Sequence, residues 1–237
     1  VLCVNLPGHL THDSLTQIAE GRSGLVRSWN PVFSSWVFGG IVEWSSGTEM
    51  LVAISASLLA AALYLLVTSN GTGRLWSLVP AALLLFTPVM VTYPGIVWKD
   101  VWFAHLALLG FGLIALRAQC IGSLSRMAAE AAALLCLAAA LLSRQTGVLV
   151  SLVGVLALTM IPGLRPGWIV GLVLRLVLMF AAAVALSTAA KTSMKSLQAH
   201  EVGTGIKLVA MFDIAGVLQR LPDAQLDVLR RDGFDTA

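Results

Sequence analysis

Long uncharged stretches of apolar residues dominate this sequence. No Asp, Glu, Lys or Arg occurs between Glu49 and Arg74, and none occurs between Arg74 and Lys99. A helix needs about 20 mostly apolar residues to cross the hydrocarbon core of a bilayer, and each stretch is long enough. Over the whole chain 58% of the residues are hydrophobic and 11% are charged, whereas soluble domains carry about 25% charged residues. The sequence therefore predicts a membrane protein.

These stretches predict an all-α fold, a polytopic membrane helix bundle of about six complete transmembrane helices. Helices are expected because the bilayer interior offers no water to bond the backbone. The predicted spans cover residues 50–68, 74–93, 101–116, 127–142, 147–161 and 168–190. Residues 1–6, VLCVNL, are too short to cross a membrane and are interpreted as the tail of a truncated first span. The chain is therefore expected to be a fragment, or trimmed.

The loops between the predicted spans fall into two alternating sets. One set contains four arginines and no acidic residue, whereas the other holds nearly all the acids. Because Lys and Arg in short loops favour the cytoplasmic side, the acidic set is predicted to face outward. Counting spans places four charged residues on that outer face, namely Asp13, Lys99, Asp100 and Arg144.

The same pattern predicts the division of the chain into domains. Residues 1–190 are the expected membrane core, and residues 7–49 are its long first outer loop. After Lys191 the chain becomes polar. Residues 191–237 are therefore predicted to begin an outer, soluble helical segment.

The first outer loop carries the main candidate for chemistry, Asp13. It lies in PGHLTHDSLTQIAEGRSGLVRSWNP, the one long polar segment in the first two thirds of the chain. Residues 11–20 have the spacing of a short helix, and Asp13 is a candidate N-cap of it. His9 and His12 flank Asp13, and imidazoles with a carboxylate suit zinc or manganese. Two histidines and one acid in a loop are a weak signal, so a divalent metal cofactor stays an open question.

Residues 32–44 are predicted to form a second helix in the same loop. Its large apolar residues share one helical stripe, which contains Phe33, Trp36, Val37, Gly40, Ile41 and Trp44. Tryptophan favours the membrane–water interface, so this stripe indicates a helix that lies on the membrane surface. The alternative is a helix packed beneath the loop.

Four segments of the chain resemble, in the same order, segments of one enzyme family. Residues 7–39, PGHLTHDSLTQIAEGRSGLVRSWNPVFSSWVFG, resemble the first outer loop of GT-C membrane glycosyltransferases, and more closely that of the bacterial multi-span branch, PG..(S/T).DS..Q...G.....WHP. YPGIVWKDVWFAHLALL at 93–109 resembles the W-K-D entry to a later span. LLSRQTGVLVSL at 141–152 and MFDIAGVLQRLP at 211–222 resemble the L-R-(N/Q)-x-G turn and the DLAG segment.

The resemblance implies a transfer of sugar from a polyprenyl-phosphate donor to a glycan, lipid or protein acceptor. The site would face the periplasm or exterior of a bacterial inner membrane. Asp13 matches the family's outer-loop acid, the expected catalytic base or metal-associated carboxylate. The chain departs from the pattern in two places: the family's WHP is Trp29-Asn30-Pro31 here, and Ser14 follows Asp13 where the mannosyltransferase branch has a second acid. Both departures weigh against a metal.

A lipid-phosphate donor needs cations at the membrane surface. Lys99 and Arg144 lie at outer ends of predicted spans, where arginine would bind a phosphate with two hydrogen bonds and lysine as a point charge. Ordinary interfacial anchoring is the alternative for both. Asp100 could orient Lys99 or cap the following helix. The predicted substrate-binding residues are Lys99, Arg144, Asp100, Trp29, Asn30 and Arg22.

Two other classes of function compete with a glycosyltransferase. A transporter or flippase of a lipid-linked or anionic solute often has internal repeats and helices broken at the midplane, and the sequence shows no such repeat. A membrane assembly factor without catalysis is also compatible with the sequence. Arg175, about two turns inside the last span, is either functional or snorkels to the surface. The small net charge of +3 gives no indication of nucleic-acid binding.

Overall fold

The structure is a computed structural model that describes residues 2–26, 30–69, 79, 82–83, 87–160, 167–194 and 196–197. All of these residues belong to one compact unit, Val1–Leu197. Most of the predicted outer segment, 191–237, lies outside the described residues, as does the segment that resembles DLAG.

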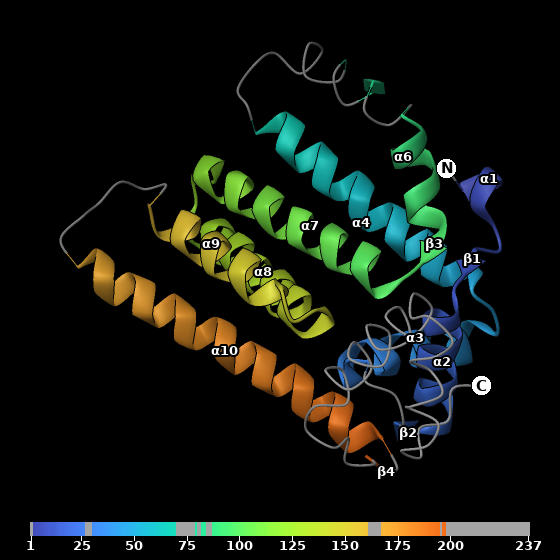
Figure 1. Cartoon of the computed structure of the whole chain (residues 1–237). Coiled ribbons are helices and arrows are strands. Elements are labelled where there is room, and N and C mark those ends of the chain that lie inside the picture. Colours follow the sequence, from blue (N-terminus) through green and yellow to red (C-terminus); the bar gives the residue numbers. More distant parts are fainter. Residues whose placement is uncertain are drawn as a thin grey trace, which may run out of the picture. The chain divides into compact units, whose positions relative to one another are not determined.

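A bundle of long helices forms the larger part of this unit, and Figure 1 shows these helices lying side by side. They are α4 (Glu49–Thr68), α7 (Lys99–Gln119), α8 (Ser123–Ser143), α9 (Gly147–Met160) and α10 (Trp168–Ser193). Four of them, all except α9, are long and apolar enough to cross a membrane. The predicted helical fold is thus confirmed, with membrane-length helices at four of the six predicted places.

The other two predicted spans are not confirmed. Helix α9 has 14 residues, which extend for about 21 Å and so fall short of the roughly 30 Å hydrocarbon core. The predicted span 74–93 lies mostly outside the described residues. Near its end the structure has α6 (Pro88–Thr92) and the short 3-10 helix η1 (Tyr93–Gly95).

The centre of the bundle is built from leucines and small residues. Leu137, Leu158 and Val155 are fully buried, together with Ala133 and Ala138 of α8. Small side chains allow membrane helices to approach closely, which increases van der Waals contact where lipid gives no hydrophobic driving force. This packing holds α7, α8, α9 and α10 in one cluster.

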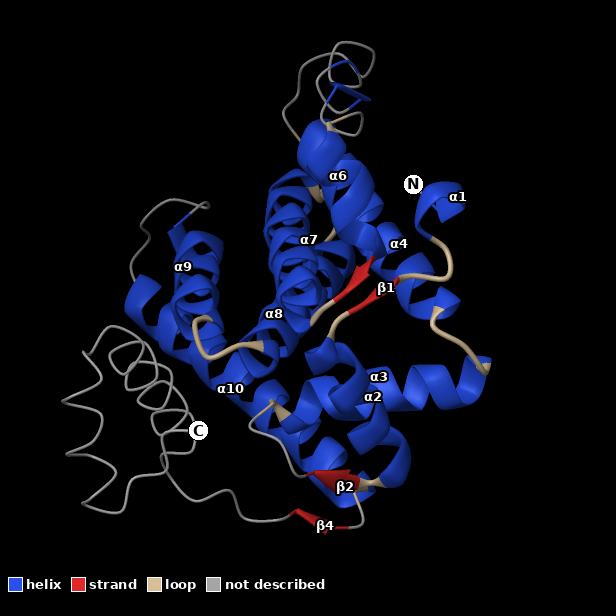
Figure 2. Cartoon of the chain, turned by 45° about the vertical axis from the view of Figure 1, so that its right-hand side comes forward, coloured by secondary structure: helices blue, strands red, loops and turns tan. Residues whose placement is uncertain are grey.

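Short strands tie the outer loop to the bundle. Strand β1 (His9–Leu10) pairs in parallel with β3 (Ile96–Val97), and Leu10 is opposite Val97. A second parallel pair joins β2 (Leu25–Val26) to β4 (Ser196–Leu197), which follows α10. Figure 2 shows these pairs in red. The first pair brings residues before α2 beside those before α7, although about 90 residues separate them in sequence.

Helix α2 (His12–Ser23) is capped by a residue other than the candidate Asp13. Its N-cap is Thr11, whose hydroxyl accepts from the backbone N–H of Ser14, while the Ser14 hydroxyl accepts from the backbone N–H of Thr11. Asp13 lies in the first turn and is not the cap. Capping therefore does not account for Asp13, although a carboxylate in the first turn is favoured by the helix dipole.

Helix α3 (Val32–Ser45) agrees with the predicted range but buries the opposite face. Its buried residues are Ser34, Ser35, Phe38, Gly39 and Val42. The predicted tryptophan stripe is left partly or fully exposed, with Trp44 76% exposed. Helix α3 thus packs beneath the loop, and Val37 and Ile41 of the stripe also pack partly against the cluster around Phe38. Contact of the stripe with a membrane surface stays a prediction.

We expect the two ends of the bundle to lie on opposite sides of the membrane. Ser23, Gln145 and Ser123 are all exposed, so their accessibility to a reagent depends mainly on the membrane. In a cysteine-free background, single cysteines at Ser23 and Gln145 should react with a membrane-impermeant thiol reagent in intact cells, and one at Ser123 should not. The opposite pattern would invert the orientation, and labelling of all three would contradict a span between them.

Candidate functional site

Lys99 is the first residue of α7 and connects this helix to the outer loop. Its Nζ donates a hydrogen bond to Asn30 Oδ1 at 2.5 Å and lies 3.8 Å from Asp13 Oδ2. Lys99 is only 7% exposed and Asn30 is 5% exposed, while the Asp13 side chain is 36% exposed. The lysine is therefore held inside, whereas its carboxylate partner can reach the solvent.

Local structure explains how Asp13 comes to lie near Lys99. The parallel pairing of β1 with β3 aligns the start of α2 with the start of α7. The Ser14 hydroxyl then donates a hydrogen bond to the carbonyl oxygen of Val97. Ser14 directly follows Asp13, and Val97 lies two residues before Lys99, so this bond helps to bring Asp13 near Lys99. Counting spans put both residues on one membrane face without predicting contact, and the structure places their charged groups 3.8 Å apart.

Arg144 approaches the same region from the turn between α8 and α9. Its Nη1 lies 3.0 Å from Asp100 Oδ1, and the arginine side chain is 45% exposed. The turn is tight, because a Cβ on Gly147 would lie 2.7 Å from the carbonyl oxygen of Ala140. Glycine is therefore required at position 147 to bring the end of α8, with Arg144, back against the start of α9.

Asp100 does not cap α7, in contrast to one of the two expectations. The N-cap is Trp98, and Asp100 lies in the first turn of the helix. Its carboxylate instead forms the ion pair with Arg144. The pair links α7 to the α8–α9 turn and orients the arginine, a role that sequence spacing could not reveal.

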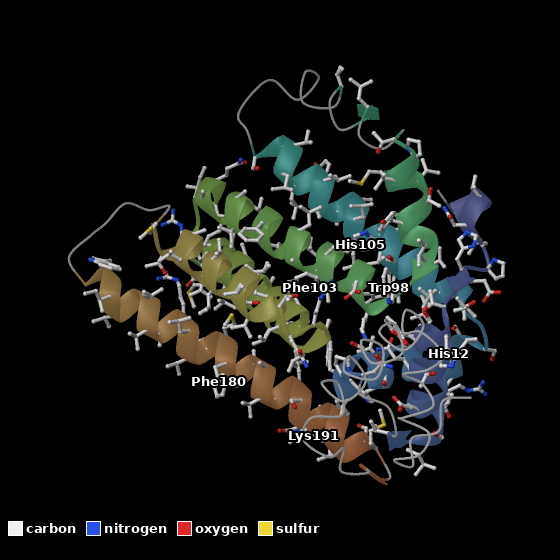
Figure 3. All side chains as sticks on the ribbon, viewed as in Figure 1. His12, Trp98, Phe103, His105, Phe180 and Lys191 are labelled. Carbon is white, nitrogen blue, oxygen red and sulfur yellow. The ribbon has the colours of Figure 1, made fainter. Side chains whose placement is uncertain are left out.

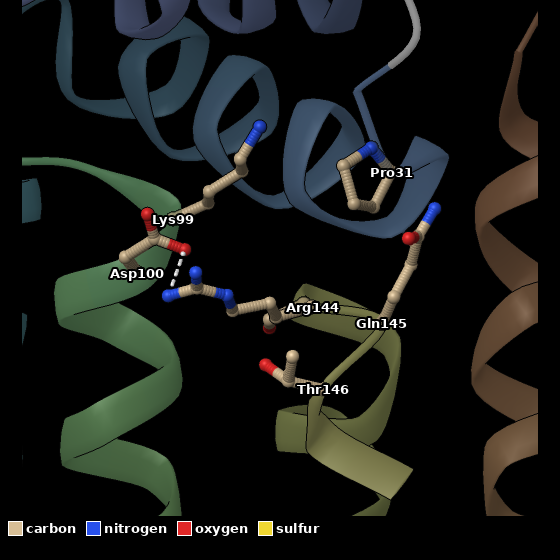
Figure 4. A pocket seen from close by; sticks show the side chains of 7 residues that line it. Pro31, Lys99, Asp100, Arg144, Gln145 and Thr146 are labelled. Atoms are coloured by element: carbon tan, nitrogen blue, oxygen red, sulfur yellow. Dashed lines mark ion pairs between the residues drawn. The ribbon is translucent and has the colours of Figure 1, made fainter. Parts of the chain in front are cut away.

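A cavity of about 250 Å³ lies at this end of the bundle. Its lining consists of Pro31, Lys99, Asp100, Ser143, Arg144, Gln145 and Thr146. In Figure 4 the Arg144 side chain extends from the turn toward Asp100, while the amino end of Lys99 is directed toward the loop helices. Ligand pockets usually enclose about 300–1,000 Å³, so this cavity is smaller than a typical ligand pocket.

Among the described residues, one of the predicted substrate-binding residues is not brought into this cluster. Arg22 lies in the last turn of α2, at the opposite end from Asp13, so about 13 Å of helix separates them. Trp29 lies outside the described residues. Asn30, in contrast, is a direct partner of Lys99, although the sequence gave no reason to pair these two.

Gln17 is a candidate site residue that the sequence analysis missed. It is fully buried, and neither atom of its amide has a hydrogen-bond partner among the described residues. A buried amide without a partner is costly. Gln17 follows Asp13 by one helical turn, so the two lie on the same face of α2. This spacing is the feature of the sequence from which Gln17 could have been predicted as a site residue.

The described residues contain no group of three His, Cys, Asp or Glu side chains that could hold a metal ion. His9 and His12 are exposed, on β1 and at the start of α2. The structure thus brings no support for a metal bound by these histidines and Asp13.

Comparison with protein-family models, with curated proteins and with solved structures finds no significant match to this chain. The function proposed below therefore rests on the residues of the site and on their resemblance to short family motifs.

Proposed function

We propose that this chain is a membrane glycosyltransferase. It moves a sugar from a polyprenyl-phosphate donor to a glycan, lipid or protein acceptor of the cell envelope, at the outer face of a bacterial inner membrane. One observation carries the proposal: two cations, Lys99 and Arg144, line a small cavity at one end of an apolar helix bundle, and the Asp13 carboxylate lies 3.8 Å from Lys99.

Such a site fits a lipid-phosphate donor. The polyprenyl tail needs an apolar environment, while its phosphate stays at the membrane surface and needs cations. Arg144 is the more accessible cation, and its guanidinium can bind two phosphate oxygens at once. Lys99 is buried between Asn30 and Asp13, so it supplies positive charge from the inner wall of the cavity.

Asp13 is the residue we assign to proton transfer. An acceptor hydroxyl attacks the sugar carbon that bears the phosphate, the bond between that carbon and the phosphate oxygen breaks, and the polyprenyl phosphate leaves with the bonding electrons. The hydroxyl proton goes to the Asp13 carboxylate. Lys99, 3.8 Å from Asp13, orients this carboxylate and keeps it near the cavity.

The short motifs that resemble GT-C enzymes also support the proposal. Three of the four segments contribute residues to this cluster: 7–39 supplies Asp13 and Asn30, 93–109 supplies Lys99, and 141–152 supplies Arg144. If the resemblance arose by chance, three segments that are far apart in sequence would not be expected to meet at one cavity.

We expect Lys99→Ala and Arg144→Ala each to weaken the use of donor. Loss of one charge-assisted contact costs about 1.5–3 kcal/mol, which is about a 10- to 150-fold loss of apparent donor affinity. The measurement is sugar transfer at limiting donor by purified full-length protein in lipid. Because Arg144 is the accessible ligand, Arg144→Lys should keep the charge, lose the two-point contact and fall between wild type and Arg144→Ala.

Wild-type turnover of both alanine variants at limiting donor would show that the phosphate binds elsewhere. A transporter or flippase would give another result. Lipid-linked sugar would be bound or moved across vesicles, and no sugar would be transferred to any acceptor.

A further inference from the structure

Three charged side chains meet inside the bundle, at the end away from Asp13. Glu130 of α8 accepts hydrogen bonds from Arg117 Nε of α7 at 2.6 Å and from Arg175 Nε of α10 at 2.7 Å. In the sequence, Arg175 is the single charge of its predicted span, 168–190. The structure instead shows that two guanidinium groups share one carboxylate. The three side chains come from three different helices and form one charged group.

This group carries an excess of positive charge. Two arginines face one carboxylate, so the net charge is +1. Each guanidinium has five N–H donors, and both arginines use Nε for Glu130. Only Arg175 makes a further contact to Glu130, a long one from Nη2 at 3.5 Å. Terminal N–H groups of both arginines thus remain for another acceptor, within the part of the chain that is described.

The depth of the group favours a further counter-charge. Glu130 and Arg175 each lie about two turns, or about 10 Å, inside α8 and α10. Charges at such depth are costly and normally pair with one another or reach toward the surface. Glu130 neutralises one arginine, and an anion would stabilise the other.

An apolar groove leads from Glu130, the member of this group that lines it, toward the middle of the helices. It has a volume of about 480 Å³ and lies between α8 and α10. On α8 it runs from Met127 and Glu130 to Leu135, and on α10 it includes Leu178 and Ala182. Leu135 and Leu178 are about half exposed, so the groove is open to the surroundings of the bundle, and in a membrane to lipid.

We propose that this groove binds an anionic phospholipid. Its phosphate would accept hydrogen bonds from the terminal N–H groups of Arg117 and Arg175, and one acyl chain would lie along Leu135, Leu178 and Ala182. The match is one of charge and direction: a net positive group about two turns inside the helices continues into an apolar groove that runs deeper. The proposal does not depend on the glycosyltransferase assignment, because the site lies at the other end of the bundle.

The test is retention of lipid by the purified protein in nanodiscs made of equal amounts of phosphatidylglycerol and phosphatidylcholine. After release into detergent, native mass spectrometry counts the lipids that stay bound. Wild-type protein should retain phosphatidylglycerol over phosphatidylcholine by about tenfold or more, the effect of a charge-assisted contact. Equal retention of the two lipids would overturn the proposal.

The variant Glu130→Gln distinguishes lipid binding by the charged group from a purely structural role of that group. It keeps the size of the side chain and raises the local charge from +1 to +2, so retention of phosphatidylglycerol should increase. A group that only ties helices together would lose stability and gain no lipid. Ala182→Phe is the second variant, because it fills the groove and leaves all three charges in place. It should reduce retention, and unchanged retention would rule out the groove.

Discussion

Asp13→Asn protein is expected to bind the lipid-phosphate donor normally and to transfer sugar at least about a hundredfold more slowly than wild type. A positioned general base contributes about 10²–10⁴ in rate, and asparagine cannot accept the proton. The substitution keeps the size of the side chain. It also removes the ion pair with Lys99, which costs about 1 kcal/mol or less because Asp13 is partly exposed. The measurements are transfer rate and donor affinity of the full-length protein.

Glu43→Gln is the matched control for this experiment. Glu43 is an exposed acid on α3 of the same loop, so the exchange removes one negative charge from the outer face and should leave transfer unchanged. Near-normal transfer by Asp13→Asn would remove Asp13 from the mechanism. Slow transfer by Asp13→Asn could not be explained by the loss of a helix cap, because Thr11 is the cap of α2.

The sequence could predict those features that depend on local composition. The uncharged stretch after Glu49 and the apolar residues after Trp168 correspond to α4 and α10, because a long apolar run has few alternatives to a helix in lipid. Counting spans put Asp13 and Lys99 on one face, and they lie 3.8 Å apart. Each of these inferences needs only the order of the segments.

Contacts between distant segments could not be predicted in the same way. Nothing in the sequence pairs Asn30 with Lys99, or Arg175 with Glu130, because a side chain's partner depends on how helices rotate and pack. The tryptophan stripe of α3 shows the same limit. Periodicity identified the stripe correctly, but small residues on the other face, among them Gly39 and Ser35, allow the closer contact and are the ones buried.

We expect Gly39→Ala to destabilise the outer loop strongly and to disturb the site with it. A Cβ on Gly39 would lie 2.3 Å from Gly21 Cα and 2.6 Å from the backbone nitrogen of Arg22. These are backbone atoms, so α2 and α3 must move apart. The expected cost is about 3 kcal/mol, the upper end of overpacking penalties. Since α2 carries Asp13 and α3 follows Asn30, both contacts to Lys99 should weaken and transfer should fall.

Gly40→Ala is the control, because a Cβ on Gly40 meets no atom within 4 Å. It exchanges the neighbouring glycine of the same helix and should stabilise the protein by about 0.5–1 kcal/mol through higher helix propensity. Thermal unfolding in detergent compares the two variants. Gly21→Ala should destabilise the protein as Gly39→Ala does. The double variant should lose less stability than the sum of the two single losses, because one added methyl group already separates the helices. Equal stability of Gly39→Ala and Gly40→Ala would contradict a close crossing of α2 and α3 at these glycines.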